Sequence, residues 1–419
     1  MSDKKLNFTY NVTLGCDPEF FFSGSKGQTT GAEKVLPENG ITYTPGTAHY
    51  DGSYTSRGDV KASKIVIDGV QAELNPRPNT CRANLGNEIS ACFRDLHKAL
   101  QAQGKGIGVN FMPLVKISQK ELDSLSEKSK TFGCAPSTNL YSAAESKITV
   151  NPKKYLKRSA GGHIHLGNNS SSQVKKTLEN VEEIVYMLDI IVGNTCVLLD
   201  RNPNNVERRK VYGRAGEYRS KEYGLEYRTL SNFWLQSYQL MSLVTGLARM
   251  AVHIVSQSGK DRDFAGEIKA AVKKDDIVKA IQENDFALAY ANFLKIENII
   301  VEIATDSYSY PITKDVINEF HWFIRKGISY WFKHDPFQHW ITLPEGHGKG
   351  WETFLQHTVR KDMEKSKENA AKLVAQIEAI KSLKEKFETL SELEPVIEKP
   401  VKAAKAVKKA VEVKEAVAK

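Results

Sequence analysis

The 419-residue sequence has only five cysteines, an odd number, and none of them forms a C-x-x-C pair. This scarcity argues against a disulfide framework or a zinc knuckle, and it suits a reducing compartment. The first ten residues, MSDKKLNFTY, lack the apolar run of a signal peptide. The most apolar stretch, IVYMLDIIVGNTCVLL, is interrupted by Asp189. We therefore expect a buried helix there and not a membrane span, in a cytoplasmic protein without a membrane partner.

A phosphate-binding loop of the form G-x-x-x-x-G-K-[ST] is also missing, and no internal repeat is evident. The segment GKGIG at 104–108 fits a helix cap that leads into a strand better than a phosphate loop. If ATP binds to this chain, we expect it to lie on the face of a sheet.

The net charge of +9 belongs mainly to one end of the chain. Residues 399–419 hold seven lysines and two glutamates, so the rest of the chain is nearly balanced. We predict a catalytic domain over 1–358, a charged helix over 359–391 and a Lys/Ala-rich disordered tail over 392–419. Nucleic acid is expected to bind weakly through this tail, if at all, and an oligomer is left open.

Apolar residues at helical spacing predict a helix over 84–103 and further helices over 172–200, 234–257, 276–296, 312–333 and 352–390. Residues 23–62 are rich in Gly, Ser and Thr, and they predict a long irregular segment. This segment is either a loop over a site or a decoration of the fold.

Four segments predict strands with an apolar face and a charged face, because alternate side chains of a strand point the same way. The segments are VTLGCDPEFFF, KIVIDGVQAELNP, GGHIHLG and YGLEYRTLSNFW. Their charged faces carry, in chain order, Thr13, Gly15, Asp17, Glu19 and Phe21; Gln71, Glu73 and Asn75; His163 and His165; Glu226 and Arg228.

This set of side chains is unusual for a half-exposed sheet, which more often carries Lys, Thr and Ser. Carboxylates without countercharge repel one another, and carboxylates with imidazole and a nearby arginine suit Mg²⁺ or Mn²⁺ holding a polyphosphate. The alternative is that the strands are not neighbours and that each motif is ordinary surface. The H-x-H motif alone does not distinguish these alternatives. A cupin, another class with an H-x-H motif, would place a glutamate a few residues later, whereas LGNNS follows here.

The order of the four motifs resembles the glutamine-synthetase-like superfamily of carboxylate–amine ligases, and most of all the phage amidoligases of type 2. The matching residues are GCDPEF (15–20), ELNPRP (73–78), GGHIHLG (161–167) and GLEYRTLSNFW (224–234). The resemblance covers roughly residues 10–240. It implies an α+β fold in which an antiparallel sheet forms a concave catalytic face backed by helices.

The resemblance also implies roles for single residues. Metal ligands would be Glu19, Glu73, Glu226 and one histidine, with His163 preferred, and Asp17 would hold a second metal. Arg228 would neutralise the transferring phosphoryl group, and Asn75 would contact the nucleotide or the substrate. Asp17 departs from the pattern, because many relatives have Glu there.

The segment ERRKVYGRAGEYRS (207–220) carries Arg208, Arg209, Arg214 and Arg219 just before the last strand. Guanidinium groups bind carboxylate and phosphate with two parallel hydrogen bonds. We therefore expect Arg208, Arg214 and Arg219 to bind ATP or a substrate carboxylate. For any single arginine, a solvated basic loop is the equal alternative.

The expected reaction joins a small-molecule or peptide carboxylate to an amine at the expense of ATP, through an acyl phosphate, with release of ADP and phosphate. The catalytic residues would be Arg228, Asp17 and His165, with His165 or a nearby carboxylate taking the amine's proton. One rival is a small-molecule kinase that uses the same face. Another is a non-catalytic phage protein that binds nucleic acid.

Overall fold

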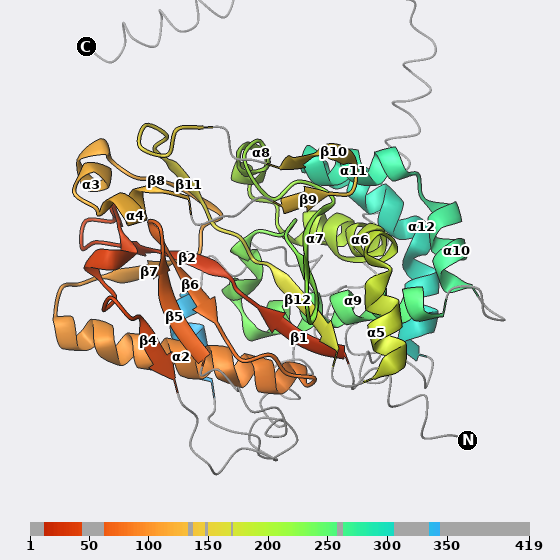
Figure 1. The fold of residues 1–419 in the computed structure, drawn as a ribbon, viewed down its shortest axis with the longest axis horizontal. Coiled ribbons are helices and arrows are strands. Elements are labelled where there is room, and N and C mark those ends of the chain that lie inside the picture. Colours follow the sequence, from red (N-terminus) through yellow and green to blue (C-terminus); the bar gives the residue numbers. More distant parts are fainter. Residues whose placement is uncertain are drawn as a thin grey trace, which may run out of the picture. The chain divides into compact units, whose positions relative to one another are not determined.

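The computed structural model describes residues 12–43, 63–132, 137–146, 150–168, 171–257, 263–305 and 335–343 (Figure 1). The chain divides into two units, Met1–Arg360 and Lys361–Lys419, and all described residues belong to the first. The predicted helices over 312–333 and 352–390 and the tail lie outside the described residues. The division into three regions stays a prediction.

The first sheet has six described strands, and its neighbouring pairs are antiparallel. In spatial order they are β1 (Val12–Cys16), β12 (Ile164–Asn168), β14 (Gly224–Tyr227), β13 (Glu217–Lys221), β9 (Ser137–Asn139) and β10 (Ser142–Ser146). Leu14, Leu166 and Leu225 lie opposite one another across β1, β12 and β14, and all three are fully buried. The alternate positions of these strands therefore face away from the core, as their period-two pattern predicts.

The second sheet also has six described strands, in the order β3 (Thr29–Thr30), β2 (Glu19–Ser23), β6 (Gln71–Asn75), β5 (Ser63–Asp68) and β4 (Ile41–Tyr43), with β7 (Gly108–Asn110) pairing with β2 as well. The segment KIVIDGVQAELNP, expected as one strand, forms a hairpin of β5 and β6, and β6 carries Gln71, Glu73 and Asn75. The hairpin turn is Gly69–Val70, where Gly69 has the positive φ of 66° that favours glycine. A separate pair consists of β8 (Leu114–Lys116) and β11 (Lys157–Ser159).

One sequence expectation is wrong in detail. The stretch VTLGCDPEFFF is not one strand, because it breaks at Asp17–Pro18 into β1 of the first sheet and β2 of the second. Proline has no N–H to donate to a sheet and fixes φ, so it ends the ladder. The alternation fails beyond the break, and Phe21, expected on the polar face, is fully buried. The polar residues thus lie on two sheets that meet at Asp17–Pro18.

Helices cover the apolar sides of both sheets (Figure 1). α9 (Tyr238–Ser256) packs on β1 and β12, while α5 (Ser172–Glu179) and α6 (Val181–Leu188) pack on β14. α2 (Arg82–Gln103) packs on β4 and β5. The expected α+β fold, with antiparallel sheets backed by helices, is confirmed.

The remaining described helices are short or lie further from the sheets. They are η1 (Ala32–Lys34), α3 (Gln119–Asp123), α4 (Glu127–Lys130), the π-helix η3 (Asp189–Gly193), α7 (Asn194–Leu199), α8 (Asn204–Arg209), η4 (Asn232–Gln236), α10 (Phe264–Ala271), α11 (Lys274–Gln282), α12 (Phe286–Thr305) and α14 (Pro336–Ile341).

The predicted helices are confirmed where they are described, but two of them are divided. The predicted helix over 172–200 breaks at Asn180 into α5 and α6, and continues through η3 into α7. The helix over 276–296 is interrupted at Asn284, which has a positive φ of 52°. Asp285 then accepts a hydrogen bond from Leu288 N at 3.0 Å and begins α12.

The long irregular segment is only partly irregular. Within 23–62, residues 23–43 include β3, η1 and β4, and residues 44–62 lie outside the described residues. The GKGIG segment behaves as expected, since Gly104 caps α2 with a left-handed φ of 62° ahead of β7.

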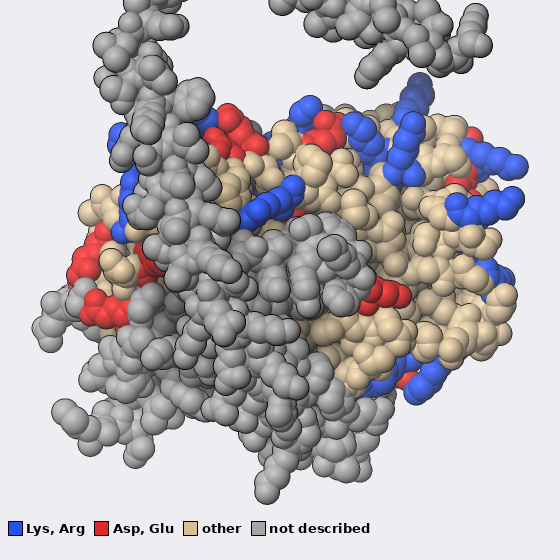
Figure 2. Space-filling model, turned by 180° about the vertical axis from the view of Figure 1, so that it is seen from behind, with Lys and Arg blue, Asp and Glu red and all other residues tan. Residues whose placement is uncertain are grey.

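α9 is long and apolar enough to cross a membrane, but 94% of its apolar window is buried inside the protein. This burial identifies it as a core helix of the fold. Cys16, Cys81, Cys92 and Cys196 are free thiols, as the sequence predicts. On the face shown in Figure 2, basic side chains lie in separate groups with acidic ones between them over the described part of the surface.

Candidate active site

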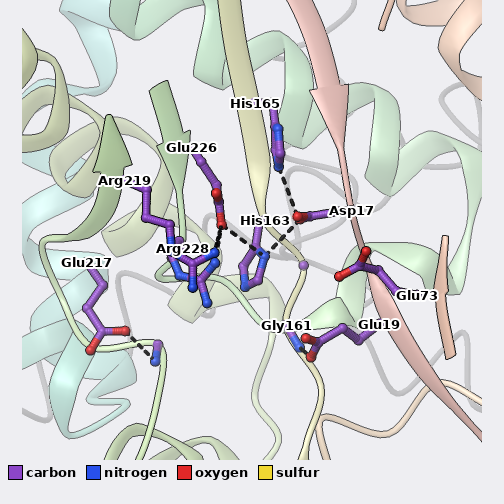
Figure 3. A network of polar contacts seen from close by, with 12 residues as sticks. Asp17, Glu19, Glu73, Gly161, His163, His165, Glu217, Arg219, Glu226 and Arg228 are labelled. Atoms are coloured by element: carbon purple, nitrogen blue, oxygen red, sulfur yellow. Dashed lines mark hydrogen bonds and ion pairs between the residues drawn. The ribbon is translucent and has the colours of Figure 1, made fainter. Parts of the chain in front are cut away.

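A row of four residues crosses the first sheet on the side away from the core. Strand register places Gly15 opposite His165, His165 opposite Glu226, and Glu226 opposite Arg219. Gly15 leaves room beside His165, since a Cβ there would lie 3.3 Å from the Cβ of His165. The structure therefore brings together the charged positions of three motifs that are far apart in the sequence (Figure 3).

Asp17 lies between the two histidines of the H-x-H motif (Figure 3). Its Oδ1 lies 2.8 Å from Nδ1 of His163, and its Oδ2 lies 3.2 Å from Nε2 of His165. Burial raises the pKa of this carboxyl, but His165 and His163 outweigh burial and hold the pKa well below its usual range. Asp17 is thus held as a carboxylate at the junction of the two sheets.

The two glycines before the histidines are required by close packing. A Cβ on Gly162 would lie 2.2 Å from the carbonyl oxygen of Ser231, and one on Gly161 would lie 2.4 Å from both His163 and Tyr212. The Gly161 N–H donates to Oε2 of Glu19 at 2.6 Å. The glycines therefore let this backbone approach the histidine and hold the Glu19 carboxylate.

A second group of carboxylates lies on the second sheet. Glu19 is paired with Glu73 across β2 and β6, and one carboxylate oxygen of each lies within 4.8 Å of one on Asp68. The sequence analysis missed Asp68, although a signal was available. Asp68 is the last strand residue before the Gly69–Val70 turn, so it lies opposite Gln71 and shares a face with Glu73.

These three carboxyls are hard to ionise together. Burial, with repulsion from Asp68, raises the pKa of Glu19 to about 8. Burial, with repulsion from Asp17, Asp68 and Glu19, raises the pKa of Glu73 to about 9. A divalent cation relieves such repulsion, and an all-oxygen set suits Mg²⁺ or Mn²⁺. These residues therefore fit the metal that the sequence predicts.

Asp17, His165 and Glu226 form a second possible ligand group, with one atom of each within 4.8 Å of the others. Glu226 is fully buried among cationic groups. It pairs with Arg228, with Lys221 Nζ at 2.8 Å and with Arg219 Nη1 at 3.4 Å. Burial raises its pKa, but His163 and Arg228 help to hold the pKa at about 2.

The possible ligand group contains His165, whereas the resemblance prefers His163, and the choice between the two histidines stays a prediction. Both ring nitrogens of His163 are engaged, Nδ1 by Asp17 and Nε2 by the hydroxyl of Tyr212. Burial, with the nearby charge of Arg228, lowers the pKa of His163 to about 4, so its ring is neutral. His163 is placed to orient Asp17, and His165 is the histidine in the possible ligand group.

Tyr212 is a further residue that the sequence analysis missed. Its ring lies under the guanidinium groups of Arg208 and Arg228, 4.9 and 5.2 Å from their Cζ atoms. It also contacts His163 edge to face, with ring centroids 5.5 Å apart. A tyrosine in a basic segment carries no distinctive motif, so the sequence gives no signal for it.

The arginines of 207–220 separate into different environments. Arg208 is fully buried and donates to the carbonyl oxygens of Ala160, Thr229 and Leu230 at 2.7–3.1 Å. Arg214 donates to the carbonyl oxygens of Arg209 and Lys210. These bonds tie both arginines to the backbone, and their expected role in binding ATP or a carboxylate stays a prediction.

Two expected ligand-binding residues do lie at the site. Arg219 faces Glu226, and Asn75 Nδ2 donates to Oε1 of Glu73 at 2.8 Å. Arg209, which the sequence places in the same basic segment, is buried and donates to Oδ1 of Asn284. The residues that the structure brings to one region (Figure 3) are Asp17, Glu19, Glu73, His163, His165, Arg219, Glu226 and Arg228. Asn75 joins them through its hydrogen bond to Glu73.

The site thus has two clusters of possible metal ligands, both rich in carboxylates, and the buried guanidinium of Arg228 lies beside them. Such a site suits metal-assisted chemistry on an anionic substrate. Residues 144–315 match the family described as Phage phiEco32-like COOH.NH2 ligase-type 2. The predicted resemblance is therefore confirmed, and the match supports an enzyme of the carboxylate–amine ligase class. It includes GGHIHLG and GLEYRTLSNFW, whereas GCDPEF and ELNPRP lie before it.

No curated protein matches this sequence. Among solved structures, "Apo GmaS without ligand" is similar at 14% identity and a TM-score of 0.31, over 73% of this chain and 75% of that one. "Crystal structure of novel glutamine synthase homolog" is similar at 11% identity and a TM-score of 0.28, over 74% of this chain and 73% of that one. Likeness at this level does not bear on substrates.

Proposed function

We propose that this protein is an ATP-dependent carboxylate–amine ligase that releases ADP and phosphate. The observation that carries the proposal is the meeting of two acidic groups at Asp17, with the guanidinium of Arg228 on Glu226. The ligase family match over 144–315 supports the reaction class. Small-molecule or peptide carboxylates and amines are the proposed substrates, and the cytoplasm is the proposed location.

The two chemical steps need different groups. In the first, a carboxylate oxygen of the substrate attacks the γ-phosphorus, the bond to the β–γ bridging oxygen breaks, and ADP leaves. In the second, the amine's electron pair forms the C–N bond, the bond from the acyl carbon to the phosphate oxygen breaks, and phosphate leaves. The amine's proton passes to a base, for which His165 is the proposed group.

The chain's own residues prepare both steps. Glu19, Asp68 and Glu73 would hold one divalent ion, and Asp17, His165 and Glu226 are the second possible set. A bound Mg²⁺ or Mn²⁺ supplies charge neutralisation for phosphate oxygens. Arg228 is held by Glu226 and by the ring of Tyr212, so its positive charge is fixed before substrate arrives.

Hydroxylamine provides the test, because it traps an acyl phosphate as a hydroxamate and replaces the unknown amine. A panel of carboxylates with Mg²⁺-ATP and hydroxylamine should yield ADP, phosphate and a hydroxamate with at least one member. Arg228→Lys should lower the rate about 10²–10³-fold, as expected for loss of a fixed charge-stabilising contact. The exposed Lys98→Ala, on α2, is the matched control and should keep the wild-type rate.

The rivals predict other products. Accumulation of a phosphorylated product that no amine consumes would identify a kinase. Absence of ATP consumption with every carboxylate, together with retention of DNA, would identify a nucleic-acid-binding protein. Either result overturns the ligase proposal.

A further inference from the structure

Tyr223, in the turn between β13 and β14, lies against His165 of the candidate active site. Its hydroxyl lies 2.6 Å from Nδ1 of His165. The two rings are stacked, with centroids 5.9 Å apart and planes 13° apart. Tyr223 is 44% exposed although it is a large aromatic residue. Its ring therefore serves the candidate active site more than the core.

The backbone of the turn fixes where this ring lies. The carbonyl oxygen of Tyr223 accepts a hydrogen bond from Asn168 N at 3.1 Å, at the end of the strand that carries His165. The next residue, Gly224, has a φ of 145°, which favours glycine. A Cβ there would also lie 2.3 Å from the carbonyl oxygen of Leu166. Tyr223 is thus tied to β12 by its backbone as well as by its hydroxyl.

The two ring nitrogens of His165 have different surroundings. Nδ1 contacts the Tyr223 hydroxyl, whereas Nε2 is buried and forms no hydrogen bond with any described residue. Nε2 lies 3.2 Å from Oδ2 of Asp17 (Figure 3), but the two groups are not aligned for a hydrogen bond. Buried polar atoms usually have a hydrogen-bond partner, so the unused Nε2 is open to a ligand.

His163 differs from His165 in this respect. Its Nδ1 lies 2.8 Å from Oδ1 of Asp17, and its Nε2 contacts the hydroxyl of Tyr212, so both nitrogens are used. The two tyrosines therefore act differently. Tyr212 completes the contacts of a fully engaged ring, and Tyr223 holds a ring whose second nitrogen is open.

The contact at Nδ1 decides which atom of His165 faces the acidic groups. A half-turn of the imidazole about its Cβ–Cγ bond exchanges Nδ1 with Cδ2 and Nε2 with Cε1. The turned ring would set a carbon against the Tyr223 hydroxyl and would withdraw Nε2 from Asp17. A tyrosine hydroxyl both donates and accepts, so it can bind Nδ1 with or without a proton on that nitrogen. The hold on the ring therefore persists while Nε2 changes partners.

We propose that Tyr223 is the positioning residue for His165, and that its hydroxyl and ring keep Nε2 directed toward the acidic groups. Tyr223 acts through His165. Its importance for turnover rests on the proposed ligase function, in which His165 takes the amine's proton. The orientation of the imidazole does not rest on that function.

The orientation is tested first, without ATP, by NMR on the full chain with ¹⁵N-labelled histidine. The His165 signals in the two-bond ¹H–¹⁵N spectrum are identified by their loss in His165→Ala. Tyr223→Phe keeps the stacked ring and deletes the hydroxyl, so the Nδ1 and Nε2 signals of His165 should both shift or broaden. Tyr290→Phe, on α12, is the matched control and should leave them unchanged. An unchanged His165 spectrum in Tyr223→Phe overturns the proposal.

A double-mutant cycle tests whether Tyr223 acts through His165. In the ligase assay, Tyr223→Phe should lower kcat about 10–100-fold, on the scale of a lost supporting hydrogen bond, with KM for ATP unchanged. In a His165→Ala background the same change should cost about twofold or less, which is within the scatter of independent sites. Tyr212→Phe, which contacts His163 instead, should keep most of its cost in that background. An equal cost of Tyr223→Phe with and without His165 would show a merely structural role.

The outcomes separate the two proposals. If the His165 signals depend on Tyr223 but no carboxylate gives a hydroxamate, the ligase is overturned and Tyr223 is left holding an imidazole with another task. If a hydroxamate forms and Tyr223→Phe turns over at the wild-type rate, the positioning role is overturned and the ligase stands.

Discussion

The hydroxyl of Tyr212 contacts Nε2 of His163, on the opposite side of the imidazole from Asp17, which lies 2.8 Å from Nδ1. The ring of His163 is therefore held from both sides. Because Asp17 belongs to a possible metal-ligand group, Tyr212 acts on that group through His163 without being one of its members.

Removing this hydroxyl should weaken the response to metal without unfolding the protein. Tyr212→Phe keeps the ring beneath Arg208 and Arg228 and deletes only the contact to His163. Loss of such a supporting hydrogen bond typically costs about 10–100-fold in metal affinity or activity. We expect the Mg²⁺ concentration for half-maximal turnover to rise by about that factor. Tyr290→Phe on α12 is the control, and an unchanged Mg²⁺ response in Tyr212→Phe would contradict the role.

Asp68 provides a second test, because the sequence motifs do not include it. Burial and repulsion from Asp17 raise the pKa of Asp68, so Asp68→Asn removes an unfavourable charge from the metal-free protein. We expect thermal unfolding at a higher temperature without Mg²⁺ and a smaller gain when Mg²⁺-ATP is added. Glu19→Gln and Glu73→Gln should behave in the same way and should abolish Mg²⁺-dependent turnover.

The exposed Asp123→Asn, on α3, is the matched control for this series and should shift neither melt. If Asp68→Asn unfolds at a lower temperature without Mg²⁺ and keeps the full Mg²⁺ gain, Asp68 supports the fold and does not hold the ion.

Asp189 predicts a pH dependence of stability. It is fully buried in η3, where it accepts a hydrogen bond from the hydroxyl of Tyr227 at 2.6 Å, and burial raises its pKa from 3.8 to about 7. Because the folded state binds this proton more tightly, its stability contribution is full below pH 3.8 and is lost as the pH rises through about 7. The whole change is on the order of 4 kcal/mol.

Asp189→Asn cannot ionise, so it should lose less stability than wild type between pH 4 and 7. Urea unfolding at several pH values in that range measures the difference. Parallel pH profiles for the two proteins would show that Asp189 ionises with an ordinary pKa.

Gly162 tests the packing behind the histidines. A Cβ there meets the carbonyl oxygen of Ser231 at 2.2 Å, and backbone yields little, so Gly162→Ala should destabilise the protein by about 1–3 kcal/mol or more. Gly108→Ala meets the side-chain oxygen of Ser23 at 2.9 Å, which can rotate away, so it serves as the milder comparison. Equal unfolding temperatures of the two variants would show that the backbone at Ser231 can move away from an added Cβ at position 162.

The tail prediction rests on sequence alone. A chain that ends at Leu390 should keep full turnover on small substrates, because the removed residues carry none of the four motifs. Loss of turnover together with an intact cooperative melt would show that the tail takes part in the reaction.

Period-two alternation is a local property of the backbone, and it was enough to identify the strands and most of the candidate residues. The polar face carries His165 and Glu226, and the core face carries Leu166 and Leu225, as expected. Each face follows from alternate positions within one strand. The helix over 84–103 is likewise local and was predicted, whereas the hairpin at Gly69 was not, although Asp68-Gly69 is a local turn signal. The resemblance over four ordered motifs supplied the reaction class.

What the tertiary structure decided is which side chains meet and which are already occupied. Pro18 separates β1 from β2 into different sheets, so the carboxylates form two groups and not one. Arg208 donates hydrogen bonds to three backbone carbonyl oxygens, and His163 contacts Asp17 and Tyr212. No sequence pattern indicates either set of contacts. Contacts of this kind join residues far apart in the chain, and their partners are fixed by packing, not by spacing along the sequence.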